Sequence, residues 1–256
     1  MPEKPEVITV AKTLEKKIIG KTITDAKVYY DNVIVGDKEE FISKIKGEKI
    51  ESITTRGKWI VIYLTNYALL THLRMEGRFY FRKKGEAVSK HEHVSLLLDN
   101  DIEMRFHDVR KFGRMILLPK YEVLNIKPLS DLGYEFDDTK LTKEYLLDKF
   151  KSNIYDDEIL YQSHINPLKP AKEINSSEAV EIIKNTKIIL KKAIEKGGTT
   201  IKSFESSEGV HGLFQNELAV HGKKNGICPN CNSKIEFIRV GGRGTYYCPK
   251  CQNINE

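Results

Sequence analysis

Two Cys-x-x-Cys pairs near the end of the chain constrain its fold more than any other feature. They are Cys228 with Cys231 and Cys248 with Cys251, and they hold all four cysteines of the 256-residue chain. Each pair places two thiolates on one tight turn, and the segment between the pairs is long enough for two strands. Four sulfur ligands suit one zinc ion, and because protein atoms fill every position, we expect Zn²⁺ in a structural role. An iron–sulfur cluster is the alternative, but the sequence has no other redox feature.

The composition is that of a globular chain with a basic excess. Hydrophobic residues make up 40%, charged residues 30%, and the net charge is +6. A polyanionic partner fits this charge, and so does a merely lysine-rich proteome. The first ten residues lack the apolar stretch of a signal peptide, and no apolar run reaches the roughly 18 residues that a membrane span needs. We therefore expect a cytoplasmic, monomeric protein with reduced cysteines and no membrane association.

Hydrophobic periodicity predicts one helix followed by a strand-rich region. Apolar residues at helical spacing indicate a helix over 6–19, and Gly20 ends it. The strand-like runs that follow are separated by short turns, which favours a β-sandwich or barrel. The predicted strands are 23–30, 49–54, 59–64, 68–73, 78–82, 93–99, 102–107 and 115–119.

The second half of the chain is predicted to be helical. Helices are expected over 142–151, 153–162 and 177–196, with Ser176 or Ser177 at the start of the last and a mobile loop over 197–212 after it. The fold class is therefore α+β. The predicted domains are a β-sandwich domain over 2–127, a linker over 128–133, a helical domain over 134–226 and a zinc hairpin over 227–256.

The N-terminus combines a proline with two carboxylates. If Met1 is removed, Pro2 presents a secondary amine, whose intrinsic pKa of about 7.7–8.0 leaves part of it unprotonated near neutrality. Such an amine can attack a sugar carbon and form an iminium, and Glu3 and Glu6 lie beside it to move protons. The alternative is an ordinary helix start, with proline in its first turn and acids favoured by the helix dipole.

The hairpin between the cysteine pairs carries Arg243 in a glycine-rich turn. Glycines allow the backbone to approach another molecule closely, and an arginine at a ribbon tip fits contact with a phosphate or a groove. A solvated turn with an incidental arginine is equally compatible with this segment alone.

Six further segments, taken in order with the N-terminus and the zinc hairpin, resemble the formamidopyrimidine-DNA glycosylase and endonuclease VIII family over nearly the whole chain. They are Arg-Gly-Lys-Trp at 56–59, His-Leu-Arg-Met-Glu-Gly-Arg at 72–78, Lys-His-Glu-His at 90–93, Asp-Val-Arg-Lys-Phe-Gly-Arg at 108–114, Ser-Asn-Ile-Tyr-Asp-Asp-Glu at 152–158 and Gly-Gly-Thr-Thr at 197–200. The resemblance implies a zinc-containing enzyme that acts on damaged double-stranded DNA.

The resemblance also implies roles for individual residues. Pro2 would attack the deoxyribose C1′, Glu3 would shuttle protons, and Lys58 would hold a phosphate beside the lesion. Two loops would probe the DNA, and elimination on both sides of the sugar would then cut the strand. The remaining implied DNA contacts are Met75, Arg110 and Phe112 in the gap left by the flipped nucleotide, His91, Asn153 and Arg243 on the backbone, and Glu76 with the 197–212 loop at the extruded base.

The set Met75, Arg110 and Phe112 resembles the formamidopyrimidine branch, so oxidised purines are the expected substrates. Two alternatives remain: an endonuclease VIII-like enzyme for oxidised pyrimidines, and a non-catalytic zinc protein that binds lesions. The latter gains weight from a departure before Asn153, where the family has a further helix and turn that this sequence lacks. The helix–two-turn–helix is thus shortened. The chain is a naturally shorter homologue, its sequence has been truncated or edited, or the segment is locally rearranged. We expect weaker DNA binding and lower stability than in a full-length relative.

Overall fold

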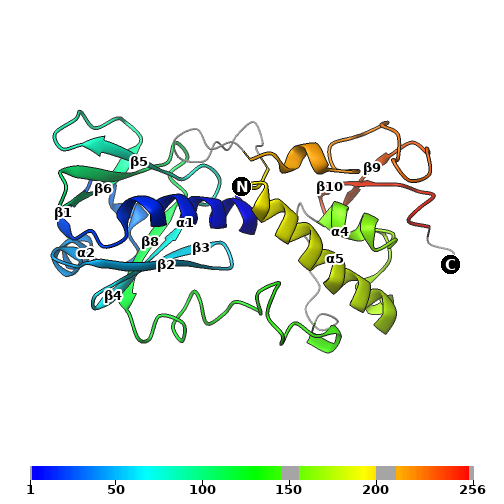
Figure 1. Ribbon diagram of the computed structural model, residues 1–256, viewed down its shortest axis with the longest axis horizontal. Coiled ribbons are helices and arrows are strands. Elements are labelled where there is room, and N and C mark those ends of the chain that lie inside the picture. Colours follow the sequence, from blue (N-terminus) through cyan, green and yellow to red (C-terminus); the bar gives the residue numbers. More distant parts are fainter. Residues whose placement is uncertain (1, 146–155, 200–211, 254–256) are drawn as a thin grey trace. The chain divides into compact units, whose positions relative to one another are not determined.

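The computed structural model describes residues 2–145, 156–199 and 212–253, and these fall into two compact units (Figure 1). The N-terminal unit comprises Met1–Gly133 with Gly197–Gly212, and the C-terminal unit comprises Tyr134–Lys196 with Leu213–Glu256. Asn153, most of the helix predicted over 142–151 and most of the loop predicted to be mobile lie outside the described residues. Among the described residues, no helix has the length and apolar character needed to cross a bilayer.

The N-terminal unit contains two four-stranded antiparallel sheets, which agrees with the predicted strand-rich β-sandwich (Figure 1). One sheet has the order β1 (Ile23–Val28), β6 (Glu92–Leu98), β7 (Ile102–His107) and β5 (Arg78–Lys83). The other has the order β2 (Ile50–Arg56), β3 (Trp59–Leu64), β4 (Tyr67–His72) and β8 (Arg114–Pro119). Short hairpins join β2 to β3, β3 to β4 and β6 to β7.

Helix α1 (Lys4–Ile18) supplies one wall of the main hydrophobic core of this unit and packs against β2 and β3. Its apolar residues Val7, Val10, Leu14 and Ile18 are each no more than 1% exposed. Helical spacing places them on one face, so a single helix buries all four against the sheets. The packing fixes the start of α1, and with it the N-terminus of the chain, relative to the sandwich.

The sequence did not predict the short helix α2 (Lys38–Ile45) or the 3₁₀ turn η1 (Asp31–Val33). Only Phe41 and Ile45 of α2 are buried, which is too short an apolar pattern to recognise. The side chain of Asp37 caps the helix by accepting the N–H of Glu40 at 2.7 Å.

The predicted linker 128–133 lies within the N-terminal unit, where Leu129 is buried beside Trp59 in a second, smaller core.

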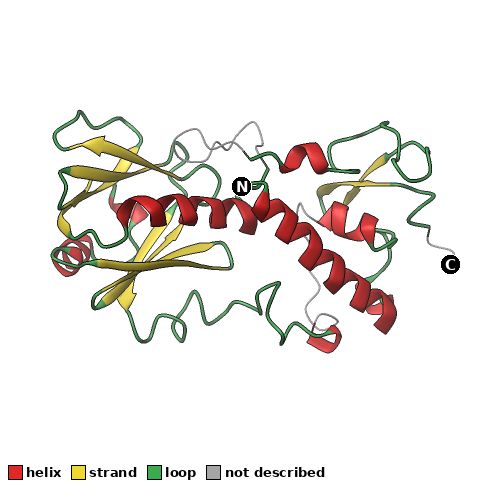
Figure 2. Cartoon of the chain, in the orientation of Figure 1, coloured by secondary structure: helices red, strands yellow, loops and turns green. Residues whose placement is uncertain are grey.

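The C-terminal unit is mainly helical and ends in a small hairpin (Figure 2). Its long helix begins one residue before the predicted start, because Asn175 caps it and exchanges hydrogen bonds with Glu178. The elements are α4 (Asp156–Gln162), η2 (Ala171–Glu173), α5 (Ser176–Glu195), η4 (Phe214–Glu217), β9 (Glu236–Val240) and β10 (Arg243–Tyr247).

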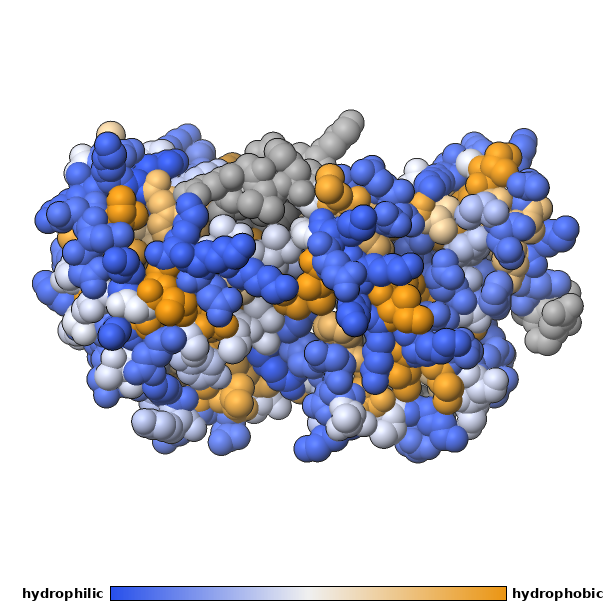
Figure 3. Space-filling model, in the orientation of Figure 1, coloured by the Kyte–Doolittle hydropathy of each residue, from blue (hydrophilic) through white to orange (hydrophobic). Residues whose placement is uncertain are grey.

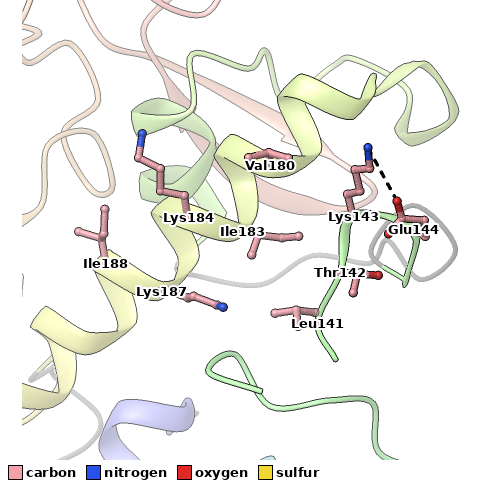
Figure 4. A pocket seen from close by; sticks show the side chains of 9 residues that line it. All are labelled: Leu141, Thr142, Lys143, Glu144, Val180, Ile183, Lys184, Lys187 and Ile188. Carbon is pink, nitrogen blue, oxygen red and sulfur yellow. Dashed lines mark ion pairs between the residues drawn. The ribbon is translucent and has the colours of Figure 1, made fainter. Parts of the chain in front are cut away.

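One face of α5 is left open in the C-terminal unit. Apolar side chains reach the surface along this helix in Figure 3, and Val180 and Ile188 are 50% and 44% exposed. They line a groove of about 580 Å³ between α5 and residues 141–144, which Lys143, Lys184 and Lys187 border (Figure 4). The described part of the unit therefore exposes apolar helix surface that a globular domain usually covers.

Candidate active site and DNA-contact residues

The N-terminal corner of the molecule places a buried carboxylate beside Pro2. Pro2 and Glu3 directly precede α1, and both are buried. The backbone N–H of Glu3 donates to the carboxylate of Glu6 at 2.8 Å, half of the capping box expected at a helix start. Lys58 lies in the β2–β3 turn and its ammonium pairs with the Glu3 carboxylate. The structure thus brings Pro2, Glu3, Glu6 and Lys58 together.

The surroundings of Glu3 favour proton transfer. Burial raises the pKa of Glu3, and this effect outweighs the opposing hydrogen bond and charge of Lys58, while the nearby Glu6 raises it further. A carboxyl group whose pKa moves toward neutrality accepts and releases protons more readily near physiological pH. The position of Lys58 gives the corner a positive charge next to that carboxylate.

Glu6 holds the corner together. Its second carboxylate oxygen accepts the backbone N–H of Thr199 at 2.7 Å and the hydroxyl of that residue at 3.1 Å. A β-carbon on Gly198 would lie 2.5 Å from the same oxygen, so only glycine lets the segment approach this closely. Because these oxygens bind amide and hydroxyl groups of the protein, the contacts of Glu6 are those of a positioning residue.

The first probing loop (residues 73–77) carries Met75 and Glu76, which are both half-buried. Arg74 has a φ of 54°, and its N–H donates to Nδ1 of His72 at 3.0 Å. Burial, and then the charges of Arg74 and Lys58, lower the pKa of His72 to about 4, so its imidazole is neutral and can accept that bond. His72 therefore fixes the stem of the first probing loop.

The second probing loop (residues 108–113) is organised by one buried carboxylate. Asp108 is 1% exposed, and its two oxygens accept the N–H groups of Arg110 at 3.0 Å and Gly113 at 2.7 Å. The loop leaves Phe112 49% exposed, with the guanidinium of Arg110 at 5.3 Å from its ring centre. A large aromatic side chain that protrudes on a rigid loop suits insertion between bases.

His91 lies next to this loop, at the end of a segment held by a buried arginine. Asp108 donates its N–H to the carbonyl of His91 at 2.9 Å. The guanidinium of Arg105, fully buried, donates to the carbonyls of Glu86 and Ala87 at 2.6 and 3.0 Å. Carboxylates of Glu92 and Glu103 balance its charge at 2.9 and 2.8 Å. The sandwich thus fixes the backbone on both sides of His91.

The four cysteines of the C-terminal unit form one metal site. Their sulfurs all lie within 4.8 Å of one another, with Cys228 and Cys251 at 3.8 Å and Cys231 and Cys248 at 3.4 Å. With Zn–S bonds of about 2.3 Å, a tetrahedral site has sulfurs about 3.8 Å apart, so the cluster fits zinc. The hydroxyl of Tyr161 lies 3.2 Å from Cys228, where it can donate to a thiolate.

Two carboxylates at the start of α4 hold the metal hairpin and the segment before it. Glu158 accepts the backbone N–H groups of Ala219, Val220 and His221 at 2.8–2.9 Å. Asp157 accepts the N–H of Tyr246 at 3.1 Å and lies 2.8 Å from the ring of His221. Arg243 opens β10 and is exposed, next to a turn in which Gly241 and Gly242 both have positive φ.

Sequence reasoning missed several of these positioning residues. Asp108 and Glu158 belong to sequence motifs that were identified, but their positioning roles were not, because these depend on which backbone N–H groups lie next to each carboxylate in the fold. His72 was part of a quoted motif and gave no separate signal. Thr199 pairs with Glu6 across a separation of 193 residues, which no local pattern can reveal.

Three family models match the chain in the order of its structural parts. The formamidopyrimidine-DNA glycosylase N-terminal domain matches residues 1–115, the H2TH domain of the same family matches 137–205, and a zinc finger found in FPG and IleRS matches 228–254. Most of the sandwich, helices α4 and α5 and the cysteine site lie within these three ranges.

Relatives of similar length match along the whole chain. The formamidopyrimidine-DNA glycosylase of Bacillus cereus is 41% identical over 273 positions, covering 98% of this chain and 99% of that protein. The Bacillus subtilis protein of the same name is 37% identical over the same shares. Since 273 positions exceed the length of this chain, some positions of the relatives have no counterpart here.

Solved structures agree with this comparison. Lactococcus lactis Fpg bound to DNA with an abasic site is 33% identical, with a TM-score of 0.89, and covers 98% of this chain and 100% of that one. The wild-type protein in complex with N7-benzyl-Fapy-dG DNA has a TM-score of 0.88 at the same identity. The fold and the site therefore define a zinc-containing DNA-repair glycosylase. More narrowly, the chain belongs to the formamidopyrimidine-DNA glycosylase family.

Proposed function

We propose that the chain excises oxidised purines, chiefly 8-oxoguanine and formamidopyrimidines, from duplex DNA and then cleaves the strand, with Pro2 as nucleophile. The observation that carries the proposal is the ion pair between the buried Glu3, directly beside Pro2, and the partly buried Lys58. A nucleophile, a carboxyl group of raised pKa and a cation for phosphate or leaving-group charge occur together there. The name of the Bacillus relatives agrees with this assignment.

The chemistry follows from the groups at the corner. The nitrogen of Pro2, once free of Met1, attacks C1′ and the bond from C1′ to the base breaks, so that the base leaves with a proton. The C1′–O4′ bond then breaks as Glu3 protonates O4′, which leaves C1′ as the iminium of Pro2. The iminium acidifies C2′, and Glu3 can remove protons during elimination. Loss of the 3′ and then the 5′ phosphate cuts the strand on both sides. Lys58 holds one of these phosphates by charge.

The probing loops account for lesion access. Met75, Arg110 and Phe112 are carried on loops whose backbones are fixed by His72 and Asp108. Inserting them costs the DNA some stacking, which contacts to the protein repay. The purine preference rests on the resemblance of this set to the formamidopyrimidine branch; the oxidised-pyrimidine enzyme remains the second candidate.

Borohydride trapping tests the nucleophile. Duplexes with 8-oxoguanine opposite cytosine are mixed with the protein processed to Pro2, and reduction should give a covalent protein–DNA adduct. Pro2→Gly should lose most of the adduct, since it replaces a nucleophilic secondary amine held in a ring with a less nucleophilic, freely rotating primary amine. A chain with a blocked N-terminus is the control, and undiminished trapping by it would assign the nucleophile elsewhere, with Lys58 next in line.

The same assay separates the alternatives. Faster excision of thymine glycol than of 8-oxoguanine would favour the oxidised-pyrimidine enzyme. Tight binding to abasic-site DNA without any adduct would indicate a lesion-binding protein without turnover. Weaker binding is expected than for a full-length relative because the shortened segment before Asn153 removes backbone N–H groups that would face phosphate. A gel-shift titration at equal salt that shows equal affinity would refute this expectation.

A further inference from the structure

Phe106 lies beneath both probing loops, although neither catalysis nor DNA contact requires a residue there. It is fully buried on β7, where it pairs with Phe79 of β5 and Val94 of β6. The rings of Phe79 and Phe106 meet edge to face, with centres 5.4 Å apart. The neighbouring strands thus hold the ring of Phe106 in one orientation.

The two loops end on the same edge of this ring. A β-carbon added to Gly77, the last residue of the first loop, would lie 2.9 Å from Cζ of Phe106. A β-carbon added to Gly113, the last residue of the second loop, would lie 2.5 Å from the same atom. Neither glycine has a positive φ, so the requirement for glycine comes from occupied space: from the ring alone at Gly113, and at Gly77 from the ring together with the carbonyl oxygen of Leu73, 2.6 Å from the added carbon.

The ring cannot give way to one loop without affecting the other. Protein interiors have few voids, so a shift of one glycine against Cζ is passed on to the ring and from the ring to the second glycine. The second loop is further tied to β7 by Asp108, two residues after Phe106, whose carboxylate accepts the N–H of Gly113. The first loop is tied to the other sheet through His72 at the end of β4.

We propose that Phe106 is a positioning residue that couples the two probing loops, so that Met75 and the pair Arg110–Phe112 enter the DNA as one unit. The proposal rests on the proposed function in assigning those side chains to the DNA gap. The coupling itself is a property of the protein alone. Its loss is expected to impair the step after binding, because the wedges would no longer reach their positions together.

The chain carries an optical reporter for one of the two loops. Trp59 is the only tryptophan, and its ring meets that of His72 edge-on at 4.9 Å. Since His72 accepts the N–H of Arg74, the emission of Trp59 responds to the stem of the first loop. Gly113→Ala lies in the second loop, one residue before Arg114, which pairs with His72 across β4 and β8, so the double variant with Phe106→Leu is needed to identify Phe106 as the link. If Phe106 couples the loops, this substitution shifts the emission of Trp59 in the free protein.

The double variant distinguishes coupling from general damage. Phe106→Leu removes Cζ, so in its presence Gly113→Ala should no longer shift the emission and should cause no further loss of activity beyond that of Phe106→Leu alone. An unchanged emission in Gly113→Ala, or strictly additive losses in the double variant, would overturn the proposal. This optical measurement needs no DNA, so it decides the coupling even if the proposed glycosylase activity fails.

The kinetics of Phe106→Leu provide the functional test. We expect kcat for 8-oxoguanine excision to fall about tenfold while KM changes less than about twofold. Phe41→Leu is the matched control, because it removes a similar volume from the same core, on α2, and lies outside the pair Phe79–Phe106. Equal effects of both variants on kcat would show a loss of stability alone and would contradict the coupling.

Discussion

Each of the two units is stabilised internally in a different way. The N-terminal unit closes two sheets and α1 around one large apolar core. The C-terminal unit has a small apolar core along α5 and a second one that includes the fully buried cysteines Cys228 and Cys248. Apolar packing is spread over many contacts, whereas a metal and a few buried carboxylates concentrate stability in single groups. The C-terminal unit is therefore expected to be far more sensitive to single changes.

Loss of zinc is expected to cause the largest loss of stability in the C-terminal unit. A structural zinc site contributes on the order of 10 kcal/mol, so Cys248→Ser or a chelator should unfold the hairpin around β9 and β10 and leave the sandwich folded. Hydrogen exchange followed by mass spectrometry measures each unit separately. Lys250→Ser, in the same turn but exposed, is the control. If the sandwich loses protection equally, the contrast between the units is wrong.

Glu158→Gln is next in size. The buried carboxylate of Glu158 accepts three backbone N–H groups. In the glutamine variant the amide NH₂ replaces one of these acceptor oxygens, so that it faces backbone N–H groups to which it cannot hydrogen-bond. We expect the C-terminal unit to lose about 3 kcal/mol of stability. Denaturant unfolding followed by tyrosine emission or exchange would measure it. Glu181→Gln, which affects only an exposed pair with Lys184, should change little; comparable losses would remove Glu158 from its assigned role.

A pH-dependent effect is expected in the N-terminal unit. The pKa of His72 is about 4 in the folded state and about 6.5 when unfolded, so the unfolded chain takes up the proton first as the pH falls. Stability should therefore decline between pH 6.5 and 4, by roughly 2 kcal/mol. His72→Gln cannot titrate and should lose this part of the decline. Parallel stability curves for the two proteins in this range would contradict the assigned pKa.

The smallest effect is expected on the open face of α5. Ile188→Ala removes a side chain that is 44% exposed and should cost less than about 0.5 kcal/mol. Ile189→Ala, one residue further and 6% exposed, should cost about 2–4 kcal/mol. Thermal unfolding of the two variants gives the comparison. Equal costs would contradict the difference in burial between these two positions of α5.

Patterns that repeat within a few residues could be predicted from the sequence. The sandwich strands, α1 and the zinc ligands follow from alternation, helical spacing and cysteine pairs, and the structure has them within a few residues of the expected bounds. Helix α2 could not be found because only Phe41 and Ile45 mark its buried side. The cap of α5 was misplaced by one residue because Asn175, Ser176 and Ser177 are all good caps.

The candidate site shows the same limit. Pro2, Glu3 and Lys58 were identified from a resemblance of ordered motifs, and the structure places them together. The residues that hold such groups in place were not identified. Phe106 reads as one more core aromatic, and its significance depends on two glycines that lie 29 residues before it and seven after it. The sequence pattern around a glycine does not show which side chain of the fold occupies the space next to it.

The bond between Glu6 and Thr199 bears on how the protein is made. The two residues are 193 positions apart, so the ribosome releases Glu6 long before it adds Thr199. At synthesis rates of 5–20 residues per second, the interval is roughly 10–40 s. During that time the nascent chain has the helix that carries Pro2 but lacks the segment that binds Glu6. The N-terminal corner is thus completed late in translation, and in an unfinished chain the proposed active site is only partly assembled.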